Sequence, residues 1–272
     1  MANKGQTTSS PTPVTRRTAL DYVQVIESTP LDDYRPGRAP WLDPDGSCGT
    51  YTAPEGFHPD IFRLRIPPAQ LATWWSERLP AFQSWPYVTV GPRETPGLAE
   101  WCLADGYTLY ERDYLMVAAA GYVTPSDLDP RVQEVGAVQD LASVFALDHL
   151  VFNDPIPDQD ALEASLAEIR RGHFRLFVVP NATGSALAAG GLTLKGSWAM
   201  MWGGETHPGH RRRGLYRALV TRRLDEAWQA GARFVATNAN QETSAPVLER
   251  MGFQIIESFV ILKPPQASPN TV

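Results

Sequence analysis

One stretch in the C-terminal part of the chain constrains the fold most, because it changes abruptly from the pattern of a strand to that of a helix. Residues 198–206 are mainly apolar and aromatic and have the length of a strand, and Pro208 and Gly209 then break any strand ladder. From Leu215 onwards apolar side chains recur at helical spacing, until Gly231 gives a stop signal. The sequence therefore predicts a strand that passes through a turn into a helix.

The turn between this strand and this helix is basic: it contains Arg211, Arg212 and Arg213 and ends with Gly214. The first turn of a helix has unpaired N–H groups and the positive end of the helix dipole, which together bind phosphate. Arginines add directed donors, and glycine lets the backbone approach a ligand closely. The alternatives are a solvent-exposed basic turn and a nucleic-acid patch. The net charge of −6, from 24 Lys and Arg against 30 Asp and Glu, favours a small phosphorylated ligand over nucleic acid.

Strands and helices continue on both sides of this junction. Periodicity and turn signals predict strands over 131–135, 174–179, 185–194, 233–237 and 254–262, helices over 138–152, 160–171 and 244–251, and a polar turn over 238–240. The two strands at 174–179 and 185–194 are expected to form a hairpin around the Asn-Ala-Thr-Gly sequence that links them.

With these elements in place, residues 131–263 resemble the GNAT superfamily of N-acetyltransferases. The resemblance rests on Arg211-x-x-Gly214 after a strand, on Asn240, and on segment 244–253, a short helix that ends in a Gly-Phe pair. It implies an α/β (α+β) fold in which a mixed sheet, flanked by helices, splays apart beside its central strand. It also implies acetyl-CoA, bound in that gap without a metal ion, as the cosubstrate.

The resemblance further implies where the CoA lies: its pyrophosphate on the backbone of the basic turn, and its pantetheine arm along the end of the preceding strand. Tyr216 departs from the family pattern, which has Gly or Ala there, so its ring has to point away from the phosphates or stack on the CoA. Adjacent glycines at 203 and 204 fit a bulged strand that opens for a ligand, although a mere sheet defect would show them too. The expected cofactor-binding residues are Gly204, Thr206, Arg211, Arg212, Arg213, Gly214, Leu215, Tyr216 and Asn240.

Attack of an amine on a thioester requires a neutral amine, a donor for the oxyanion and stabilisation of the leaving thiolate. We expect Glu205 to be the catalytic base, because it is the carboxylate nearest in sequence to the predicted thioester, with a solvent-facing glutamate as the alternative. His207 and His210 lie in the phosphate turn, where structural or CoA-contacting roles are favoured. Many family members have a tyrosine acid at the position of Leu248, and this chain lacks it.

These features predict direct transfer of an acetyl group, in a ternary complex, to an amine of a small molecule or peptide. A non-catalytic protein that binds or senses acyl-CoA is the alternative, and the leucine at the acid position favours it. The acceptor is not readable from the sequence. Asp148, His149, Asn153 and Asp154 are candidates to face a cationic amine, with capping or solvated roles as the alternative.

The N-terminal half contains what reads as a diverged copy of the same pattern. Segments 85–95 and 98–107 repeat the order of 233–253, strand, polar turn with Glu-Thr, helix and Gly-aromatic pair, at an offset of about 146 residues. This half has no Arg-x-x-Gly before a helix, and residues 30–58 resemble an irregular insertion. We therefore predict a tandem protein, with a degenerate, non-catalytic GNAT-like domain over 18–122 and the acetyltransferase domain over 128–264. Its tryptophans are expected mainly in the core, with a pocket wall as the alternative. They are Trp74, Trp75, Trp85 and Trp101.

The remaining segments and the composition set the expected surroundings of the protein. Residues 1–17 read as a disordered lead-in and residues 265–272 as a tail, and no stretch is long and apolar enough to cross a membrane. Two distant cysteines, Cys48 and Cys102, argue for the cytoplasm and against a disulfide framework or zinc site, and the five histidines are scattered. A monomer or homodimer with no nucleic-acid or membrane partner is expected.

Overall fold

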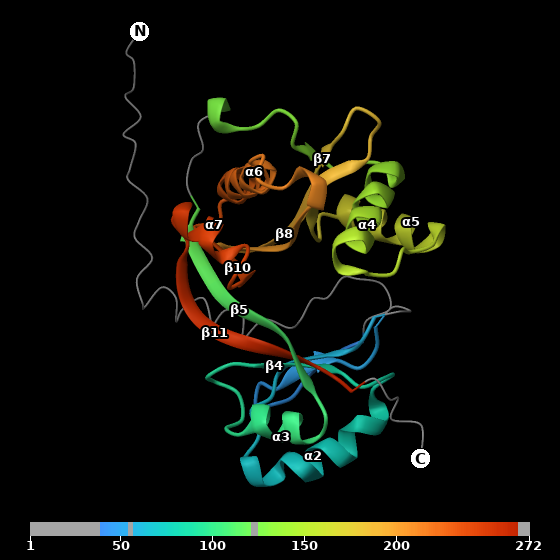
Figure 1. The fold of residues 1–272 in the computed structure, drawn as a ribbon, viewed down its shortest axis with the longest axis vertical. Coiled ribbons are helices and arrows are strands. Elements are labelled where there is room, and N and C mark those ends of the chain that lie inside the picture. The colour runs from blue at the N-terminus through green and yellow to red at the C-terminus, as the bar shows by residue number, and fades with distance from the viewer. Residues whose placement is uncertain (1–38, 54–56, 121–124, 266–272) are drawn as a thin grey trace.

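The computed structural model describes residues 39–53, 57–120 and 125–265, which fold around one mixed sheet of eleven strands (Figure 1). The strands lie in the order β1-β2-β3-β4-β11-β5-β10-β9-β8-β7-β6. The N-terminal half supplies β1 Pro40–Leu42, β2 Cys48–Thr50, β3 Asp60–Arg63, α2 Leu71–Arg78, β4 Tyr87–Val90, α3 Leu98–Ala104 and β5 Thr108–Ala119. The C-terminal half supplies β6 Gln133–Glu134, α4 Val138–Phe152, α5 Gln159–Arg170, β7 Arg175–Pro180, β8 Ala186–Lys195, β9 Trp198–Thr206, α6 Leu215–Gln229, β10 Phe234–Asn240, α7 Ala245–Arg250 and β11 Gln254–Lys263.

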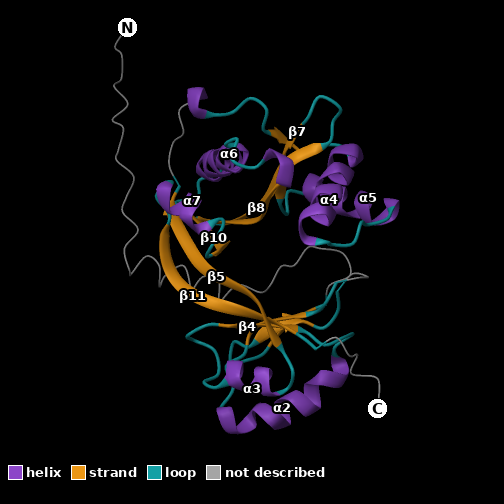
Figure 2. Cartoon of the chain, viewed as in Figure 1, coloured by secondary structure: helices purple, strands orange, loops and turns teal. Residues whose placement is uncertain are grey.

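The two halves exchange their last strands. β5, from the N-terminal half, lies between β10 and β11, where it pairs antiparallel with both, and β11 lies between β5 and β4. In Figure 2 these long strands run from the α6–α7 part of the molecule down to the α2–α3 part. A boundary near residue 122 therefore divides the chain but not the sheet.

The C-terminal part of the sheet opens beside β9. β9 and β10 are parallel and pair from Trp198–Phe234 as far as Met201–Thr237. Beyond that point β9 continues along β8, and β10 continues along β5. The two strand ends, residues 202–206 and 238–240, thus lose their mutual pairing, which leaves main-chain polar groups available at this point of the sheet. We call this feature the β9–β10 opening.

Helices cover both faces of this part of the sheet, and each face has its own apolar core. α6 packs on one face over Phe177, Leu192, Met201 and Val235, and this face is called the α6 face. α4 and α5 pack on the other face over Leu176, Val178 and Ala189, and this is the α4 face. The core of the N-terminal half lies around Trp75, with Trp74, Trp85 and Trp101 packed into the same cluster, as expected for core tryptophans.

Most elements of the C-terminal half lie where the sequence pattern puts them, including the β7–β8 hairpin and the β9–turn–α6 junction. The predicted turn over 238–240 is wrong, because these residues extend β10 along β5. The description of 30–58 as irregular is also wrong for part of its length, since β1 and β2 add two edge strands to the sheet. The predicted lead-in over 1–17 lies outside the described residues, as does nearly all of the tail over 265–272.

Candidate active site

The basic turn has a backbone shaped by two residues with positive φ. Arg212 adopts φ 62° and Gly214 adopts φ 80°, and α6 begins immediately afterwards at Leu215. No side chain caps the N-terminus of α6, so its first N–H groups stay available to a ligand. A Cβ on Gly214 would meet nothing within 4 Å, so glycine serves the backbone conformation and not close packing in this state. The turn thus presents an open anion-binding helix end.

The two histidines of the turn help to build it. The Gly209 N–H donates to Nδ1 of His207 at 3.1 Å, and the rings of His207 and His210 lie edge to face at 5.2 Å. Arg211 donates from Nε to the carbonyl oxygen of Thr206 at 3.3 Å, which ties the turn to the end of β9. These contacts agree with structural roles for both histidines.

β9 carries a bulge immediately before Glu205. The register with β8 shifts between Ala189–Glu205 and Gly191–Trp202, and Gly203 within the bulge adopts φ 56°. The paired glycines at 203 and 204 therefore mark a real bulge, which leaves extra main-chain groups beside the β9–β10 opening.

Glu205 is buried, with 3% of its surface exposed, which excludes the solvent-facing alternative. Its register partner Ala189 belongs to the core under α4 and α5, so its side chain lies on the α4 face. Within the described residues, the Glu205 carboxyl has no hydrogen-bond partner from another residue apart from the neighbouring Asp148 carboxyl. Burial raises the pKa of Glu205 well above its ordinary value, the Asp148 carboxyl adds to the rise, and the Arg223 guanidinium opposes it.

Asp148 of α4 is the polar group beside Glu205. Burial raises the pKa of Asp148 as well, while its hydrogen bond with Glu205 lowers it. Two carboxyl groups can share a hydrogen bond only when one of them holds a proton. The pair therefore combines one protonated group with one group that can accept a proton near neutral pH.

Arg223 of α6 lies behind the bulge, fully buried, and was missed from the sequence because it reads as part of the solvated face of α6. Its guanidinium donates to the carbonyl oxygens of Gly191 and Trp202, both at 3.2 Å, and to that of Leu219 at 3.3 Å. A Cβ on Gly190 would approach this guanidinium to 2.7 Å. Arg223 thus fixes the β8–β9 bulge and places positive charge near Glu205.

Tyr216 lies in the first turn of α6 and reaches across to two other elements. Its ring packs on Gly204 of β9, and its hydroxyl lies beside Ser244, at the start of α7. Burial raises the pKa of Tyr216, so it stays a hydrogen-bond donor at neutral pH. Leu248, by contrast, has no exposed surface and belongs to the core, so it faces no ligand here.

Asn240 ends β10, and its side chain is already engaged. Its Oδ1 accepts from the backbone N–H groups of Glu242 and Thr243, and its Nδ2 donates to Glu111 of β5 at 3.0 Å. A side-chain contact with the CoA would have to displace these bonds. Any role of Asn240 toward the cofactor therefore falls to its main chain.

Of the residues expected to face an amine, the structure brings only Asp148 next to Glu205. Asn153 caps α4 with φ 61°, and Nδ1 of His149 lies 2.8 Å from the carbonyl oxygen of Asp154. These two residues have capping roles. The charge of Asp154 contributes to the raised pKa of Asp148 and also to those of Tyr87 and Tyr110 in the N-terminal half, so it adds negative charge between the two halves near this pair.

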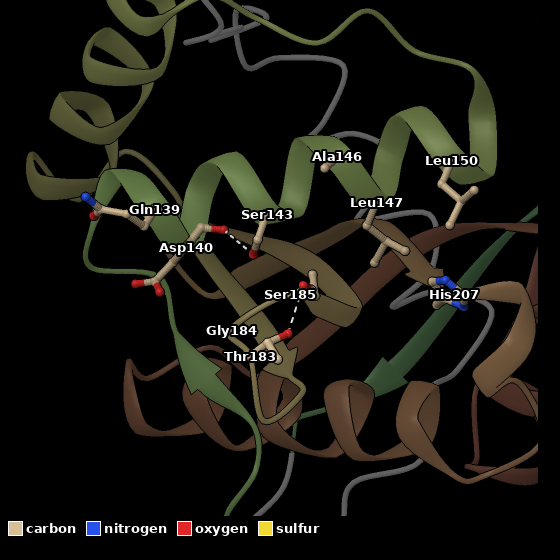
Figure 3. A pocket seen from close by; sticks show the side chains of 11 residues that line it. Gln139, Asp140, Ser143, Ala146, Leu147, Leu150, Thr183, Gly184, Ser185 and His207 are labelled. Atoms are coloured by element: carbon tan, nitrogen blue, oxygen red, sulfur yellow. Dashed lines mark hydrogen bonds between the residues drawn. The ribbon is translucent and has the colours of Figure 1, made fainter.

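A groove of about 490 Å³ runs along α4 beside the site (Figure 3). Its polar lining comes from the first turns of α4 and from the β7–β8 turn, and Leu147 and Leu150 lie toward His207 (Figure 3). Glu205 and Asp148 do not line it. Its Asp140 is occupied with the N-terminus of α4, where it accepts from the Ala137 N–H. The groove therefore borders the predicted phosphate turn, whereas the buried pair of Glu205 and Asp148 lies outside its lining.

Comparison with known proteins decides the family of this site. Residues 139–253 match the model of the acetyltransferase (GNAT) family. This part of the chain is a GNAT acetyltransferase domain. The match makes the protein an acyltransferase, as the sequence predicted. No curated protein matches the sequence.

Solved structures extend the GNAT likeness over almost the whole chain. A GCN5-related N-acetyltransferase from Kribbella flavida is similar with a TM-score of 0.62 and 16% identity, covering 94% of this chain and 97% of that one. One from Sphaerobacter thermophilus has a TM-score of 0.52 and 15% identity, covering 89% and 84%. A tandem GNAT protein from the clavulanic acid biosynthesis pathway has a TM-score of 0.50 and 17% identity, covering 89% and 86%. At these identities they establish a shared fold.

The residues that the structure describes contain neither a metal cluster nor a membrane-spanning helix. No group of three or more His, Cys, Asp or Glu side chains there is arranged to hold a metal ion. Among the helices of the described part, none is long and apolar enough to cross a membrane. Cys48 and Cys102 are both buried and unpaired, as expected.

Proposed function

We propose that the protein transfers an acetyl group from acetyl-CoA to an amine of a small molecule or peptide, by direct attack in a ternary complex. The family uses acetyl-CoA, and two features of this chain fit it. The uncapped N-terminus of α6 after the Arg212–Gly214 backbone suits a pyrophosphate. The β9–β10 opening offers unpaired strand edges on which a pantetheine arm can form main-chain hydrogen bonds.

The observation that carries the proposal is the burial of Glu205 beside this opening. A buried carboxylate with a raised pKa is a stronger base than an ordinary carboxylate, so it can take a proton from an attacking ammonium. The neighbouring Asp148 carboxyl contributes to the raised pKa of Glu205. Main-chain N–H groups of the bulged segment 203–206 are the donors that we assign to the oxyanion.

The N-terminal half supports a non-catalytic role for its own copy of the fold. There β3 and β4 are parallel, pair at Asp60–Tyr87 and Ile61–Val88, and are joined through α2, like β9 and β10 through α6. Main-chain groups of the segment that follows β3 are already hydrogen-bonded to Thr95. Its N–H donates to the Leu64 carbonyl oxygen at 2.7 Å, and its Oγ1 accepts the Ile66 N–H at 3.1 Å. The chain itself thus binds the main-chain groups that a pantetheine would need.

The test is acetyl-CoA binding by calorimetry to the wild type and to Gly214→Asp. An aspartate there opposes the phosphates by charge and strains the positive φ, so we expect binding to fall by at least about tenfold. Gly196→Asp, at an exposed glycine of positive φ in the turn between β8 and β9, is the control matched for charge and backbone strain. Equal affinity of Gly214→Asp and the wild type would refute the assignment. Release of free thiol with a panel of amines then separates transfer from mere CoA binding.

A further inference from the structure

Asp113 is a buried carboxyl group that the proposed reaction does not use. It lies on β5 with 7% of its surface exposed, and within the described residues its Oδ1 has no hydrogen-bond partner. Burial and the neighbouring Glu111 raise its pKa to about 7. An unsatisfied buried carboxyl destabilises a fold, so its presence calls for a function.

Asp113 lies on the same face of the sheet as Glu205. Leu115 and Val117, which follow it at alternate positions of β5, pack with Trp198 and Ala236 on the side opposite α6. That is the α4 face, to which Glu205 also points. Asp113 pairs in register with Asn240, at the end of β10. The two carboxyl groups therefore lie on opposite sides of the β9–β10 opening.

Their separation follows from the strand order. β10 lies between β9, which carries Glu205, and β5, which carries Asp113. Neighbouring strands are about 4.8 Å apart, so the two carboxyl groups are on the order of 10 Å apart or more. One amino group cannot contact both. The amine at Glu205 must also become neutral to attack, so a positive charge that satisfies Asp113 has to belong to another group of the acceptor.

We infer, on the basis of the proposed function, that Asp113 binds a second, cationic group of the acceptor, which is a diamine or another compound with two separated amino groups. Glu111 adds negative charge at the same place, since its Oε1 lies 3.0 Å from Nδ2 of Asn240, next to Asp113 in register. An ammonium group would give Asp113 its missing partner and restore its carboxylate form. The exchanged strand β5 thus makes the N-terminal half part of the acceptor site.

The experiment compares Asp113→Asn with the wild type by release of free CoA thiol. Substrates are a series of α,ω-diaminoalkanes of increasing length and the n-alkylamines of matching length. We expect the wild type to prefer a diamine of suitable length by at least about tenfold in kcat/KM, the size expected for a charge-assisted hydrogen bond. Asp113→Asn should lose this preference and keep the rate with alkylamines. Asp105→Asn, an exposed carboxylate after α3, is the control.

The possible results distinguish a failure of the diamine inference from a failure of the proposed function. Equal rates with diamines and alkylamines in the wild type would overturn the inference, as would a preference that survives in Asp113→Asn. Acetyl-CoA binding without acetylation of any diamine would overturn it as well, while leaving the CoA site intact. Failure of the wild type to bind acetyl-CoA would instead refute the proposed function. Calorimetric acetyl-CoA affinity and melting temperature verify that each variant is folded.

Discussion

The ring of Tyr216 lies so close to Gly204 that a Cβ on the glycine would be 2.8 Å from Cε2 of the tyrosine. This contact joins the first turn of α6 to the bulged strand, and the tyrosine hydroxyl lies beside Ser244 at the start of α7. A large side chain, where the family has a small one, is accommodated because β9 has no side chain at that point. Tyr216 therefore closes the α6 side of the β9–β10 opening.

This position leads to a prediction about the thiol of bound CoA. If the CoA sulfur lies beside Gly204, the Tyr216 hydroxyl can donate to the thiolate and stabilise it. Tyr216→Phe should then raise the pKa of the bound thiol by about 1–2 units, because a hydrogen bond to a charged acceptor contributes about 1.5–3 kcal/mol. Ultraviolet absorbance of the thiolate, followed against pH in the enzyme–CoA complex, measures it. Tyr114→Phe, in the same core, should leave the thiol unchanged, and an unchanged thiol in Tyr216→Phe would remove this role.

Glu205 gives a prediction about pH. A base with a raised pKa is active in its deprotonated form, so the acetylation rate should rise as pH increases through that pKa. Glu205→Gln should abolish this rise of the rate with pH and lower kcat by about 10²-fold or more, with acetyl-CoA affinity nearly unchanged. Asp148→Asn should retain part of the rate, but the rate should rise at lower pH than in the wild type, because the variant lacks a charge that raises the Glu205 pKa. A wild-type pH profile in Glu205→Gln would return this residue to a structural role.

Ionisation of Glu205, which should raise the acetylation rate, should lower the stability of the folded protein. Because its pKa is higher in the folded than in the unfolded state, the folded protein holds the proton longer, and stability falls as pH rises between the two values. Glu205→Gln should therefore raise the melting temperature by a few degrees at pH 8 and make little difference at pH 4. Thermal unfolding at the two pH values measures it. A rise of the same size at both would mean that ionisation of Glu205 is not the cause.

Gly190, which lies against Arg223, is predicted to be sensitive to substitution. Its substitution by alanine would press a Cβ to 2.7 Å from the buried Arg223 guanidinium, which is fixed by three carbonyl oxygens. We expect Gly190→Ala to cost about 1–3 kcal/mol in urea unfolding. Gly136→Ala, where a Cβ meets nothing within 4 Å, should be nearly neutral. In an Arg223→Met background the cost of Gly190→Ala should shrink, and an unchanged cost would show that the clash lies elsewhere.

Local pattern was enough to predict the elements of the C-terminal half and to single out Glu205 at the end of β9, because strand and helix periods and the Arg-Gly turn are properties of short segments. Asp113 and Arg223 could not be found this way. Asp113 reads as one polar residue among others in segment 108–114, and it meets Asn240 only because β5 crosses into the other half. Arg223 reads as a solvated helix residue, and its burial requires the glycine opposite it at position 190, where a side chain would meet the guanidinium.

The strand exchange predicts that neither half folds alone. If β5 is removed, β10 and β11 lose the strand that lies between them, and the cores to which Met116 and Val117 belong become exposed. If β11 is removed, the N-terminal half loses Leu262 from its core. Fragments 1–122 and 123–272 should each lack a cooperative unfolding transition by circular dichroism, whereas the coexpressed pair should co-purify and regain one. A matched cut at the β7–β8 turn, after residue 183, serves as a control for chain cleavage that separates no exchanged strand. Cooperative folding of 123–272 by itself would contradict the interdependence, because β10 and β11 would then need no strand between them.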